Sequence, residues 1–371
     1  MDKMYVEDCC QILDSMRVPI TASDRKEGEY PYYGANGIQD YVADYIFDDE
    51  LVLLAEDGGN FGSKERPIAY RVSGKCWVNN HAHVLKPKEG LDVDYLYYSL
   101  MFYNVDGMVN GATRKKLTQA AMRKMQIPSR SMEEQKFIVD ELNRIIKIKE
   151  QRQQELQLLD NLIKARFVEM FGDPELNPMG WEQVTLNDVC SSIVRGPFGS
   201  ALKKEFFVEP DETTYKVYEQ KHAIQKSASI GTYYITEEKY QELKRFECLP
   251  GDILMSCSGT MGELYQLPDG CEKGVINQAL CKFTLNERIL PICFLVYMKQ
   301  TIGNLETKGS GIQNIAAVSY VKQMPINLPP MDVQNEFEQF VHQVDKSKVA
   351  VQKALDEAQQ LFDSLMQEYF G

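Results

Sequence analysis

His81 and His83 are the first residues of this 371-residue chain whose spacing suggests chemistry, because a strand directs side chains two apart to one face. Two histidines on one face could supply two ligands to a metal ion. Packing produces the same spacing, and the chain has only four histidines, with no partner cluster around this pair. Pro210-Asp211 likewise lacks the downstream acid-x-Lys element of a metal-dependent nuclease. We therefore expect neither a metal site nor a cofactor.

Common catalytic motifs are also absent from the sequence. It contains no GxxxxGK[ST] phosphate loop, no GxGxxG, no HExxH and no GxSxG elbow. The nine cysteines include no CxxC pair, which favours reduced thiols over metal or redox ligands. The sequence predicts a chain with no catalytic centre of its own.

The composition indicates a folded cytoplasmic protein. A hydrophobic content of 44% is typical of globular chains. The first residues, MDKMYVEDCCQILDS, lack the basic region and apolar run of a signal peptide. No apolar stretch approaches the roughly 18 residues that a membrane span needs. We expect a cytoplasmic location and no membrane partner.

The charge balance at first argues against a nucleic-acid partner. The chain has 41 Lys and Arg against 54 Asp and Glu, a net charge of −13, whereas phosphate binding usually accompanies a basic balance. By segment the balance is 16 − 19 = −3 for residues 1–131, 7 − 8 = −1 for 132–172, 15 − 19 = −4 for 173–330 and 3 − 8 = −5 for 331–371. The densest acidity lies in the last segment. Each of the two large segments is nearly balanced and can still carry a basic face.

A long internal repeat is the most informative pattern in the chain. Three pairs of short segments share one offset of 199 residues: Met125–Pro128 with Met324–Asn327, Met132–Gln135 with Met331–Gln334, and Phe171-Gly172 with Phe370-Gly371. A constant offset of this length indicates a duplicated domain rather than a solenoid.

Each copy ends in a long segment with helical periodicity. Residues 132–172 and 331–371 carry apolar side chains at three- and four-residue steps, with no Pro or Gly before the terminal glycine. About 40 residues at 1.5 Å each predict rods of roughly 60 Å. We expect two solvated, coiled-coil-like helices that pack antiparallel. Their outward faces are predicted to carry the charges of Lys149, Arg152, Arg166, Asp356, Asp363 and Glu368.

The segments before the helices have a different pattern. Aromatic and β-branched runs such as Tyr32-Tyr33, Leu51–Leu54 and Ile253–Met255 alternate with glycine-rich turns. The predicted fold class is α+β, with two mixed α/β domains separated by two long antiparallel helices in an internal pseudo-two-fold repeat. We place the first domain at residues 1–131, the central helix at 132–172, the linker and second domain at 173–330, and the C-terminal helix at 331–371.

The chain resembles the specificity subunit of type I restriction-modification systems over essentially its whole length. The resemblance rests on the order of its motifs: Tyr30–Ile38, Asn80-His81-Ala82, Ile127-Pro128 ahead of Glu133–Gln135, Phe167–Pro174, Asn177–Trp181 and Asn277-Gln278-Ala279. The sequence departs from the pattern twice. The first copy lacks a counterpart of Gly180-Trp181-Glu182, and it has lost the proline pair that the second copy keeps at Pro329-Pro330.

The resemblance implies a DNA-binding protein that is not itself an enzyme. Its two globules would be target-recognition domains, each reading one half of a split DNA site. The helices would space the globules and dock partner proteins. The implied partners are double-stranded DNA, DNA-methyltransferase (modification) subunits and, through these, ATP-dependent restriction subunits.

Candidate DNA-contacting residues are the Lys, Arg, Asn, Gln, Ser and aromatic side chains on predicted turns. The loops at Gly111–Lys116 and Gly309–Asn314 hold similar places ahead of the two helices, which favours both. In the first domain the candidates are Tyr33, Asn36, Lys64, Arg66, Asn80, Arg114, Lys115 and Lys116. In the second they are Arg195, Lys203, Lys204, Lys221, Ser258, Gln278, Gln313 and Asn314.

An alternative without DNA stays open at this point. A coiled-coil scaffold with two protein-binding modules would explain the repeat and the acidity equally well. Salt-dependent retention on DNA separates the two interpretations, since phosphate contacts weaken steeply as salt rises.

Overall fold

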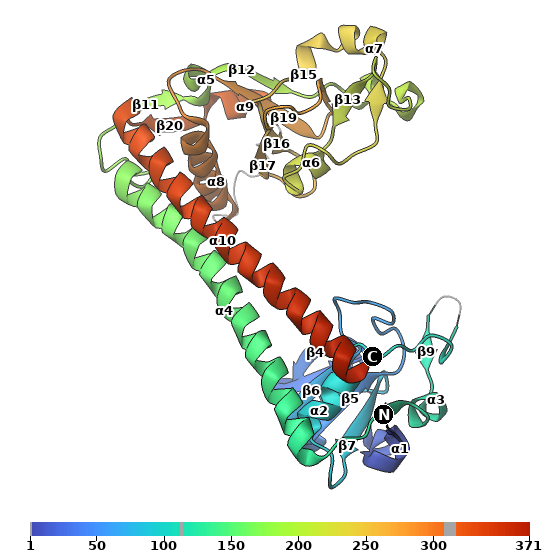
Figure 1. The fold of residues 1–371 in the computed structure, drawn as a ribbon. Coiled ribbons are helices and arrows are strands. Elements are labelled where there is room, and N and C mark those ends of the chain that lie inside the picture. Colours follow the sequence, from blue (N-terminus) through green and yellow to red (C-terminus); the bar gives the residue numbers. More distant parts are fainter. Residues whose placement is uncertain (1, 112–113, 308–316) are drawn as a thin grey trace. The chain divides into compact units, whose positions relative to one another are not determined.

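The chain divides into two compact units in a computed structural model that describes residues 2–111, 114–307 and 317–371 (Figure 1). One unit comprises Met1–Gln154 and Val351–Gly371, and the other comprises Glu155–Ala350. We call them unit 1 and unit 2. Each unit contains a mixed α/β globule together with half of each long helix.

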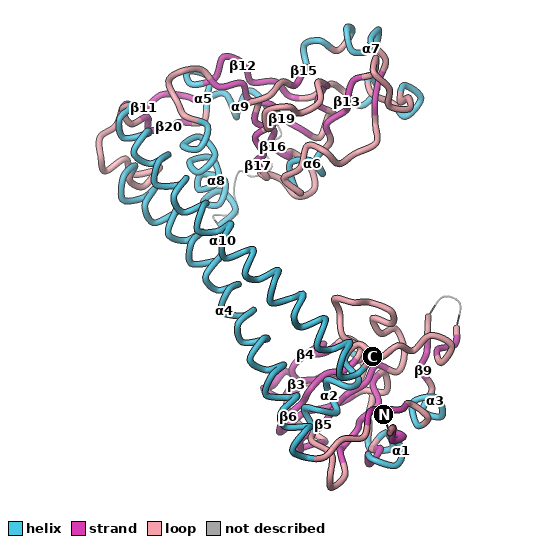
Figure 2. Tube along the Cα trace, in the orientation of Figure 1, coloured by secondary structure: helices cyan, strands magenta, loops and turns pink. Residues whose placement is uncertain are grey.

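The two long helices are α4 (Met132–Phe171) and α10 (Met331–Phe370), each of 40 residues (Figure 2). Ser131 begins α4 with a capping box, in which its Oγ accepts from the Glu134 amide at 3.2 Å and the Glu134 carboxylate accepts from the Ser131 amide at 2.8 Å. Gly172 ends α4 with a φ of +79°, a left-handed conformation that favours glycine. Local capping chemistry therefore sets both ends of α4.

The helices pack antiparallel within each unit, as predicted. In unit 2, Arg166 contacts Glu336 at 2.7 Å and Asp160 contacts Lys348 at 2.5 Å. In unit 1, the Tyr369 hydroxyl donates to Glu141 at 2.6 Å, and the Lys149 ammonium lies 5.0 Å from the centre of the Phe362 ring. Residue numbers rise along one helix as they fall along the other in both units.

These contacts correct the predicted outward faces of the helices. Lys149 and Arg166 contact the opposite helix rather than solvent alone. Asp356, Asp363 and Glu368 are exposed, as expected. Periodicity identifies the apolar face of a helix, but long charged side chains can still reach across the seam.

Unit 1 is built on a six-stranded sheet in the order β2-β7-β5-β6-β3-β4. Only the β3–β6 pair is parallel within this sheet. Helix α2 packs on β5 and β6 (Figure 1). The sheet strands are β2 (Cys10–Ile12), β3 (Glu27–Gly34), β4 (Gly37–Val42), β5 (Phe47–Ala55), β6 (Ala69–Val78) and β7 (Ala82–Pro87); the other elements are β1 (Lys3–Tyr5), α1 (Val6–Cys9), α2 (Val93–Met101), β8 (Val109–Asn110), β9 (Lys116–Leu117), α3 (Gln119–Arg123) and β10 (Gln126–Pro128).

Unit 2 has two four-stranded sheets, in the orders β12-β19-β16-β17 and β14-β13-β18-β15. The first is antiparallel, and the second contains the parallel β13–β18 pair. Its elements are β11 (Glu182–Thr185), α5 (Leu186–Val189), β12 (Cys190–Arg195), β13 (Tyr215–Tyr218), α6 (Gln220–Ile224), β14 (Tyr234–Ile235), α7 (Glu237–Glu242), β15 (Glu247–Cys248), β16 (Ile253–Ser256), β17 (Leu264–Gln266), β18 (Gly274–Ile276), β19 (Leu280–Leu285), α8 (Pro291–Thr307), α9 (Val318–Gln323) and β20 (Pro325–Leu328).

The long helices are also part of the hydrophobic cores. Phe167 and Phe171 of α4 contact Phe337 of α10 in unit 2, with ring centres 5.6 and 5.2 Å apart. In unit 1, Phe370 of α10 lies 5.3 Å from Tyr95 of α2. The expected solvated arms are therefore partly core elements, and each helix ends in the core of the other copy's globule.

A buried glutamine joins each globule to the start of its helix. Gln135 accepts from the Asp92 amide at 2.8 Å and donates to the carbonyls of Gly90 and Arg130. Gln334 makes the same three bonds with Leu290, Arg288 and Pro329. The sequence offset of 199 residues thus corresponds to a repeated set of hydrogen bonds.

No helix in the described part of the chain has both the length and the apolar character to span a membrane.

Replacing either glutamine by alanine is expected to destabilise the unit that contains it. Each change leaves one amide and two carbonyls without their partner, at a cost of about 1–3 kcal/mol for each group that stays dry. We expect urea unfolding to show a loss of at least about 2 kcal/mol for Gln135→Ala and for Gln334→Ala. Gln151→Ala, an exposed change on α4, should remain within about 0.5 kcal/mol of wild type. Equal midpoints for all three variants would contradict this role.

Candidate nucleic-acid interface

Equivalent turns follow the central strands β5 and β16. After β5, the Glu56 amide donates to the His81 carbonyl at 2.8 Å; after β16, the Cys257 amide donates to the Ala279 carbonyl at 2.8 Å. Each turn then reaches a glycine in the left-handed region, Gly58 with φ +64° or Gly259 with φ +60°. Glycine adopts this conformation without strain. Asp57 and Ser258 are therefore equivalent positions on the two turns.

A second pair of equivalent turns lies beside them. The Asn79 amide donates to the Tyr33 carbonyl at 3.0 Å, and the Asn277 amide donates to the Tyr218 carbonyl at 2.9 Å. The two asparagine side chains then accept from the amides of His81 at 2.7 Å and Ala279 at 3.0 Å. This shared geometry makes Asn80 and Gln278 equivalent, and both are exposed.

Several unit 1 candidates gather at the turn after β5. Asn36 donates to the Gly58 carbonyl at 3.0 Å. Arg114 contacts the Asp57 carboxylate at 2.9 Å, and Lys116 contacts the Glu56 carboxylate at 2.9 Å. These contacts join three separate segments of the chain at one turn, where His81, the neighbour of Asn80 in the chain, also contacts Asp57 at 2.6 Å.

The other unit 1 candidates differ in exposure. Lys64 and Arg66 are exposed on the loop between β5 and β6, and Lys115 is exposed ahead of β9. Tyr33 is half-buried against a cluster of buried side chains that includes Leu53 and Val78. Burial raises the pKa of Tyr33 above its usual value. Its aromatic ring is thus part of the support for the turn as well as a candidate contact.

In unit 2 the candidates surround the turn after β16. Ser258 donates to the Gln220 side chain at 3.0 Å, and half-buried Arg195 donates to the Cys257 carbonyl at 3.4 Å. Lys221 contacts Glu219 at 2.6 Å and lies 5.4 Å from the Tyr233 ring centre.

The remaining unit 2 candidates lie in two places. Lys203 and Lys204 are exposed on the segment after β12, where Lys203 lies 3.6 Å from Glu205. Gln313 and Asn314 lie outside the described residues, as does the whole of their predicted loop, Gly309–Asn314.

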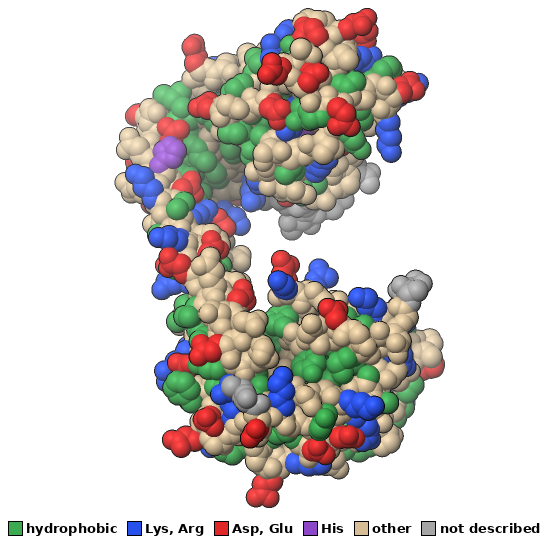
Figure 3. Space-filling view, turned by 45° about the vertical axis from the view of Figure 1, so that its right-hand side comes forward, with side chains coloured by type: hydrophobic (Ala, Val, Ile, Leu, Met, Phe, Trp, Pro, Cys, Tyr) green, Lys and Arg blue, Asp and Glu red, His purple; other side chains and the backbone are tan. Residues whose placement is uncertain are grey.

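The face of each unit that Figure 3 shows carries no continuous basic patch among its described residues. On the visible face of each unit, Lys and Arg side chains alternate with Asp and Glu (Figure 3). Several candidate cations are paired with carboxylates on the same turns, as Arg114 is with Asp57. A nucleic acid would therefore meet a mixed surface of amides, cations and paired acids.

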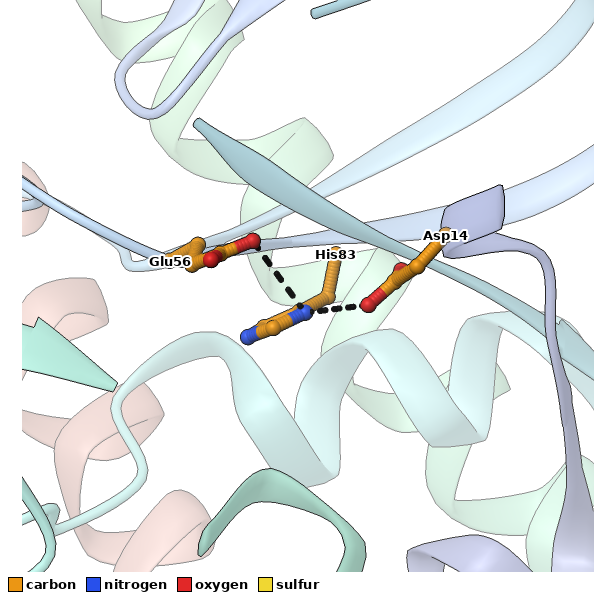
Figure 4. A group of neighbouring side chains, drawn as sticks. All are labelled: Asp14, Glu56 and His83. Carbon is orange, nitrogen blue, oxygen red and sulfur yellow. Dashed lines mark hydrogen bonds and ion pairs between the residues drawn. The ribbon is translucent and has the colours of Figure 1, made fainter. Parts of the chain in front are cut away.

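Beneath the first turn lies a buried group of Asp14, Glu56 and His83 (Figure 4). His83 lies between the two acids, with Nδ1 2.7 Å from an Asp14 oxygen and 3.7 Å from a Glu56 oxygen. Its Nε2 lies 2.9 Å from the Leu117 carbonyl oxygen. Carbonyl and carboxylate oxygens only accept hydrogen bonds, so each ring nitrogen of His83 faces an acceptor.

This group could offer three ligand atoms to a metal ion, but protein cations already occupy its surroundings. Arg17 contacts Glu56 at 2.5 Å and Asp14 at 3.5 Å, and Lys116 contacts Glu56 at 2.9 Å. With both ring nitrogens of His83 engaged, a metal would have to displace several of these bonds. The arrangement is that of an ionic network within the protein.

The network also sets the ionisation of its acids. Burial by itself would raise the pKa of Asp14, but the hydrogen bond and charge of His83, with a bond from Gln119, hold it below its usual value. Burial would likewise raise the pKa of Glu56, and bonds from Arg17 and Lys116 lower it. Both carboxyls are therefore ionised in the folded unit at neutral pH.

The sequence matches a family model described as the type I restriction modification DNA specificity domain, over residues 1–158 and 178–358. The chain belongs to this specificity family. It is 28% identical over 347 residues to a type I restriction enzyme specificity subunit of Haemophilus influenzae, spanning 89% of this chain and 84% of that protein. It is 26% identical over 117 residues to the EcoprrI specificity subunit of Escherichia coli, spanning 31% of this chain and 28% of that protein.

Solved structures show the same specificity-subunit fold. The crystal structure of the M. genitalium type I S subunit superposes with a TM-score of 0.54 at 13% identity, covering 100% of this chain and 96% of that one. A chain from a study of type I complex assembly and conformational transition gives a TM-score of 0.62 at 15% identity, covering 100% and 97%. Specificity subunits are the non-catalytic components of their complexes, which agrees with the predicted lack of a catalytic centre.

Sequence reasoning missed two residues at these turns. Asp57 contacts His81 at 2.6 Å in unit 1, and the Gln220 side chain accepts from Ser258 in unit 2. Asp57 had a visible signal, because it precedes a glycine turn directly after an apolar run. Gln220 had none, since its contact lies 38 residues away in the chain.

Acid is expected to weaken unit 1 through the buried network. A lowered carboxyl pKa contributes stability that is complete above the ordinary carboxyl range, about pH 4, and is lost as pH falls through the lowered value. Asp14→Asn should reduce the thermal unfolding temperature of unit 1 at pH 7, and this deficit should shrink as pH falls below about 4. Asp106→Asn, an exposed change in the same unit, should follow the wild-type curve. A deficit for Asp14→Asn that stays constant from pH 7 to pH 3 would refute the ionic role.

Proposed function

We propose that this chain is the DNA-binding subunit of a type I restriction-modification complex and that its two units each read one half of a bipartite target. Membership of the specificity family supports the proposal. So does the duplication of the turns in the two units, because two equivalent readers in one chain suit a target with two parts.

The observation that best supports the proposal is the structural equivalence of Asn80 and Gln278. Both are exposed amides on matching turns, held by matching bonds of Asn79 and Asn277. A side-chain amide can donate to and accept from one adenine edge in the major groove, so it can specify a base. Nearby cations such as Arg114 and Lys204 suit guanine edges or phosphates.

The acidity of the chain fits a binding mode with few phosphate contacts. Affinity would then depend strongly on base contacts, and long-range attraction to DNA would be weak. A scaffold that binds only proteins would show no retention on DNA at any salt concentration. The assembled complex with its modification subunits is the proper sample for this comparison, since that is where the chain is proposed to act.

Each unit is expected to recognise one half-site. Asn80→Ala should weaken recognition at one half-site and Gln278→Ala at the other, by about 1–3 kcal/mol for each lost base-edge pair. Asn187→Ala, an exposed change on α5, serves as the control. The measurement is methylation at single-base resolution in cells that carry each variant with its modification subunits. Loss of discrimination at both half-sites from one substitution would contradict separate readers, and a uniform affinity loss would assign the residue to phosphate contact.

The exposed apolar residues of the long helices are proposed to dock the modification subunits. Leu158 and Leu162 of α4 are four residues apart on one helical face, with exposed fractions of 66% and 47%. Exposed apolar patches of this kind mark protein-binding surfaces.

Replacing both leucines by serine should weaken capture of the modification subunit by at least about tenfold, as expected for truncated anchors at an interface core. Both side chains are exposed, so circular dichroism and the unfolding midpoint should change little. Asn161→Ser, an exposed polar change on the same helix, is the control. Normal capture by the double variant would place docking elsewhere in the chain.

A further inference from the structure

We propose that the buried ionic network of Asp14, Arg17, Glu56 and His83 is a positioning device for the Arg114–Leu117 segment and so for DNA recognition by unit 1. The inference rests on the proposed function, because Arg114, Lys115 and Lys116 are among the candidate DNA contacts. Its structural part, the anchoring of the segment, can be tested without DNA.

The segment is fastened to the network by bonds at successive residues. The Leu117 carbonyl accepts from His83 at 2.9 Å, and the Leu117 amide donates to the Glu56 carbonyl at 2.7 Å. The Lys115 carbonyl accepts from the Gly58 amide at 3.1 Å. Lys116 contacts the Glu56 carboxylate at 2.9 Å. The end of the candidate loop is thus held by main-chain and side-chain bonds at once.

The network draws its members from separate elements. Asp14 follows β2, Glu56 follows β5, and His83 lies on β7. Asp14 also accepts from the Val84 amide at 2.9 Å and from the Gln119 side chain at 2.8 Å. Arg17 adds a bond to the Ala82 carbonyl at 2.8 Å. The bond to Asp14 ties Gln119, the first residue of α3, to the sheet. The segment is therefore anchored on both sides of Leu117.

Burial makes the bonds of this anchor costly to break. His83 is fully buried, and Asp14 and Glu56 have exposed fractions of 7% and 9%. Removing one partner of a buried charged pair leaves the other without compensation, which is costly. The segment therefore cannot shift away from the sheet without breaking bonds that water does not readily replace.

Unit 2 has no such network at the matching positions. Strand register pairs Leu54 with His83 in unit 1 and Met255 with Cys281 in unit 2, and Glu56 matches Cys257 through their equivalent amide bonds. Both cysteines are buried. Two thiol side chains replace a carboxylate and an imidazole there, so weakening the network should affect the half-site read by unit 1 alone.

Two substitutions of His83 separate the anchoring bond from the rest of the network. A glutamine amide nitrogen comes close to the Nε2 position and can keep the bond to the Leu117 carbonyl. An asparagine amide nitrogen comes close to Nδ1 and can keep the bond to Asp14 only. His83→Asn should therefore release the segment, whereas His83→Gln should retain it.

Hydrogen exchange of the full chain tests the anchor directly. The amides of Leu117 and Gly58 should exchange at least about tenfold faster in His83→Asn than in His83→Gln, while amides of unit 2 stay unchanged. Similar exchange in both variants would overturn the anchoring role. If His83→Asn does not fold, Glu56→Gln provides the second test. It weakens the Arg17 and Lys116 contacts but keeps the main-chain bond to Leu117. The exchange rates of the Leu117 and Gly58 amides should therefore rise, but less than in His83→Asn.

DNA binding by the complex with modification subunits tests the consequence. His83→Asn should weaken binding at the unit 1 half-site at least fivefold and leave the other half-site unchanged, with His83→Gln close to wild type. In an Arg114→Ala, Lys115→Ala background the effect of His83→Asn should largely disappear, because the segment it positions no longer contributes. A merely destabilising change would lower affinity equally in both backgrounds.

The outcomes distinguish this inference from the proposed function. If the wild-type complex shows half-site recognition but the two His83 variants bind alike, the positioning role is wrong and the function stands. If the wild-type complex shows no sequence-specific DNA binding while the exchange difference is present, the function fails and the anchor remains as a structural feature only.

Discussion

The three hydrogen bonds of a buried glutamine are the constraint on which each globule's attachment to its helix depends. Gln135 and Gln334 each satisfy one amide and two carbonyls where the chain turns from the globule into a long helix. Both glutamine side chains are buried, so leaving their own polar groups unpaired would cost more than the bonds gain. The first turns of α4 and α10 are thereby fixed against α2 and α8. The side chains that follow, such as Leu142 and Val341, then enter the cores in a defined orientation.

The duplication explains why this attachment occurs twice and how the two copies depend on each other. Phe171 ends the helix of the first copy but packs in unit 2, and Phe370 ends the helix of the second copy but packs in unit 1. Each core therefore requires a helix end contributed by the other copy. Neither copy would have a complete core by itself.

The two copies share a frame but differ in the chemistry beneath their turns. Equivalent main-chain bonds fix the turns after β5 and β16 and the exposed amides at Asn80 and Gln278. Beneath the first turn lies an ionic network around His83, and at the matching places of the second lie Cys257 and Cys281. The main-chain frame is insensitive to such replacements because its bonds use amides and carbonyls. Side chains on and under the turns can thus diverge while the fold is kept, which suits a family whose members are proposed to read different targets.

The sequence by itself determined the repeat and the two long helices, because these follow from the constant offset and from local periodicity. The two copies in one chain predicted the antiparallel packing, and turn signals placed Asn80 and Gln278 on turns. Only the tertiary structure decided which charged side chains are paired within the protein and which can contact a partner. Lys116 is paired with Glu56 and Arg166 with Glu336, and the Asp14–Gln119 contact joins residues 105 apart in the chain. Such pairings depend on which strands become neighbours, and no local pattern records them. The partial burial of Tyr33 and Arg195 belongs to the same class. Periodicity identifies the face of an element that is buried, whereas ionic partners are chosen by the sheet order that brings distant segments together.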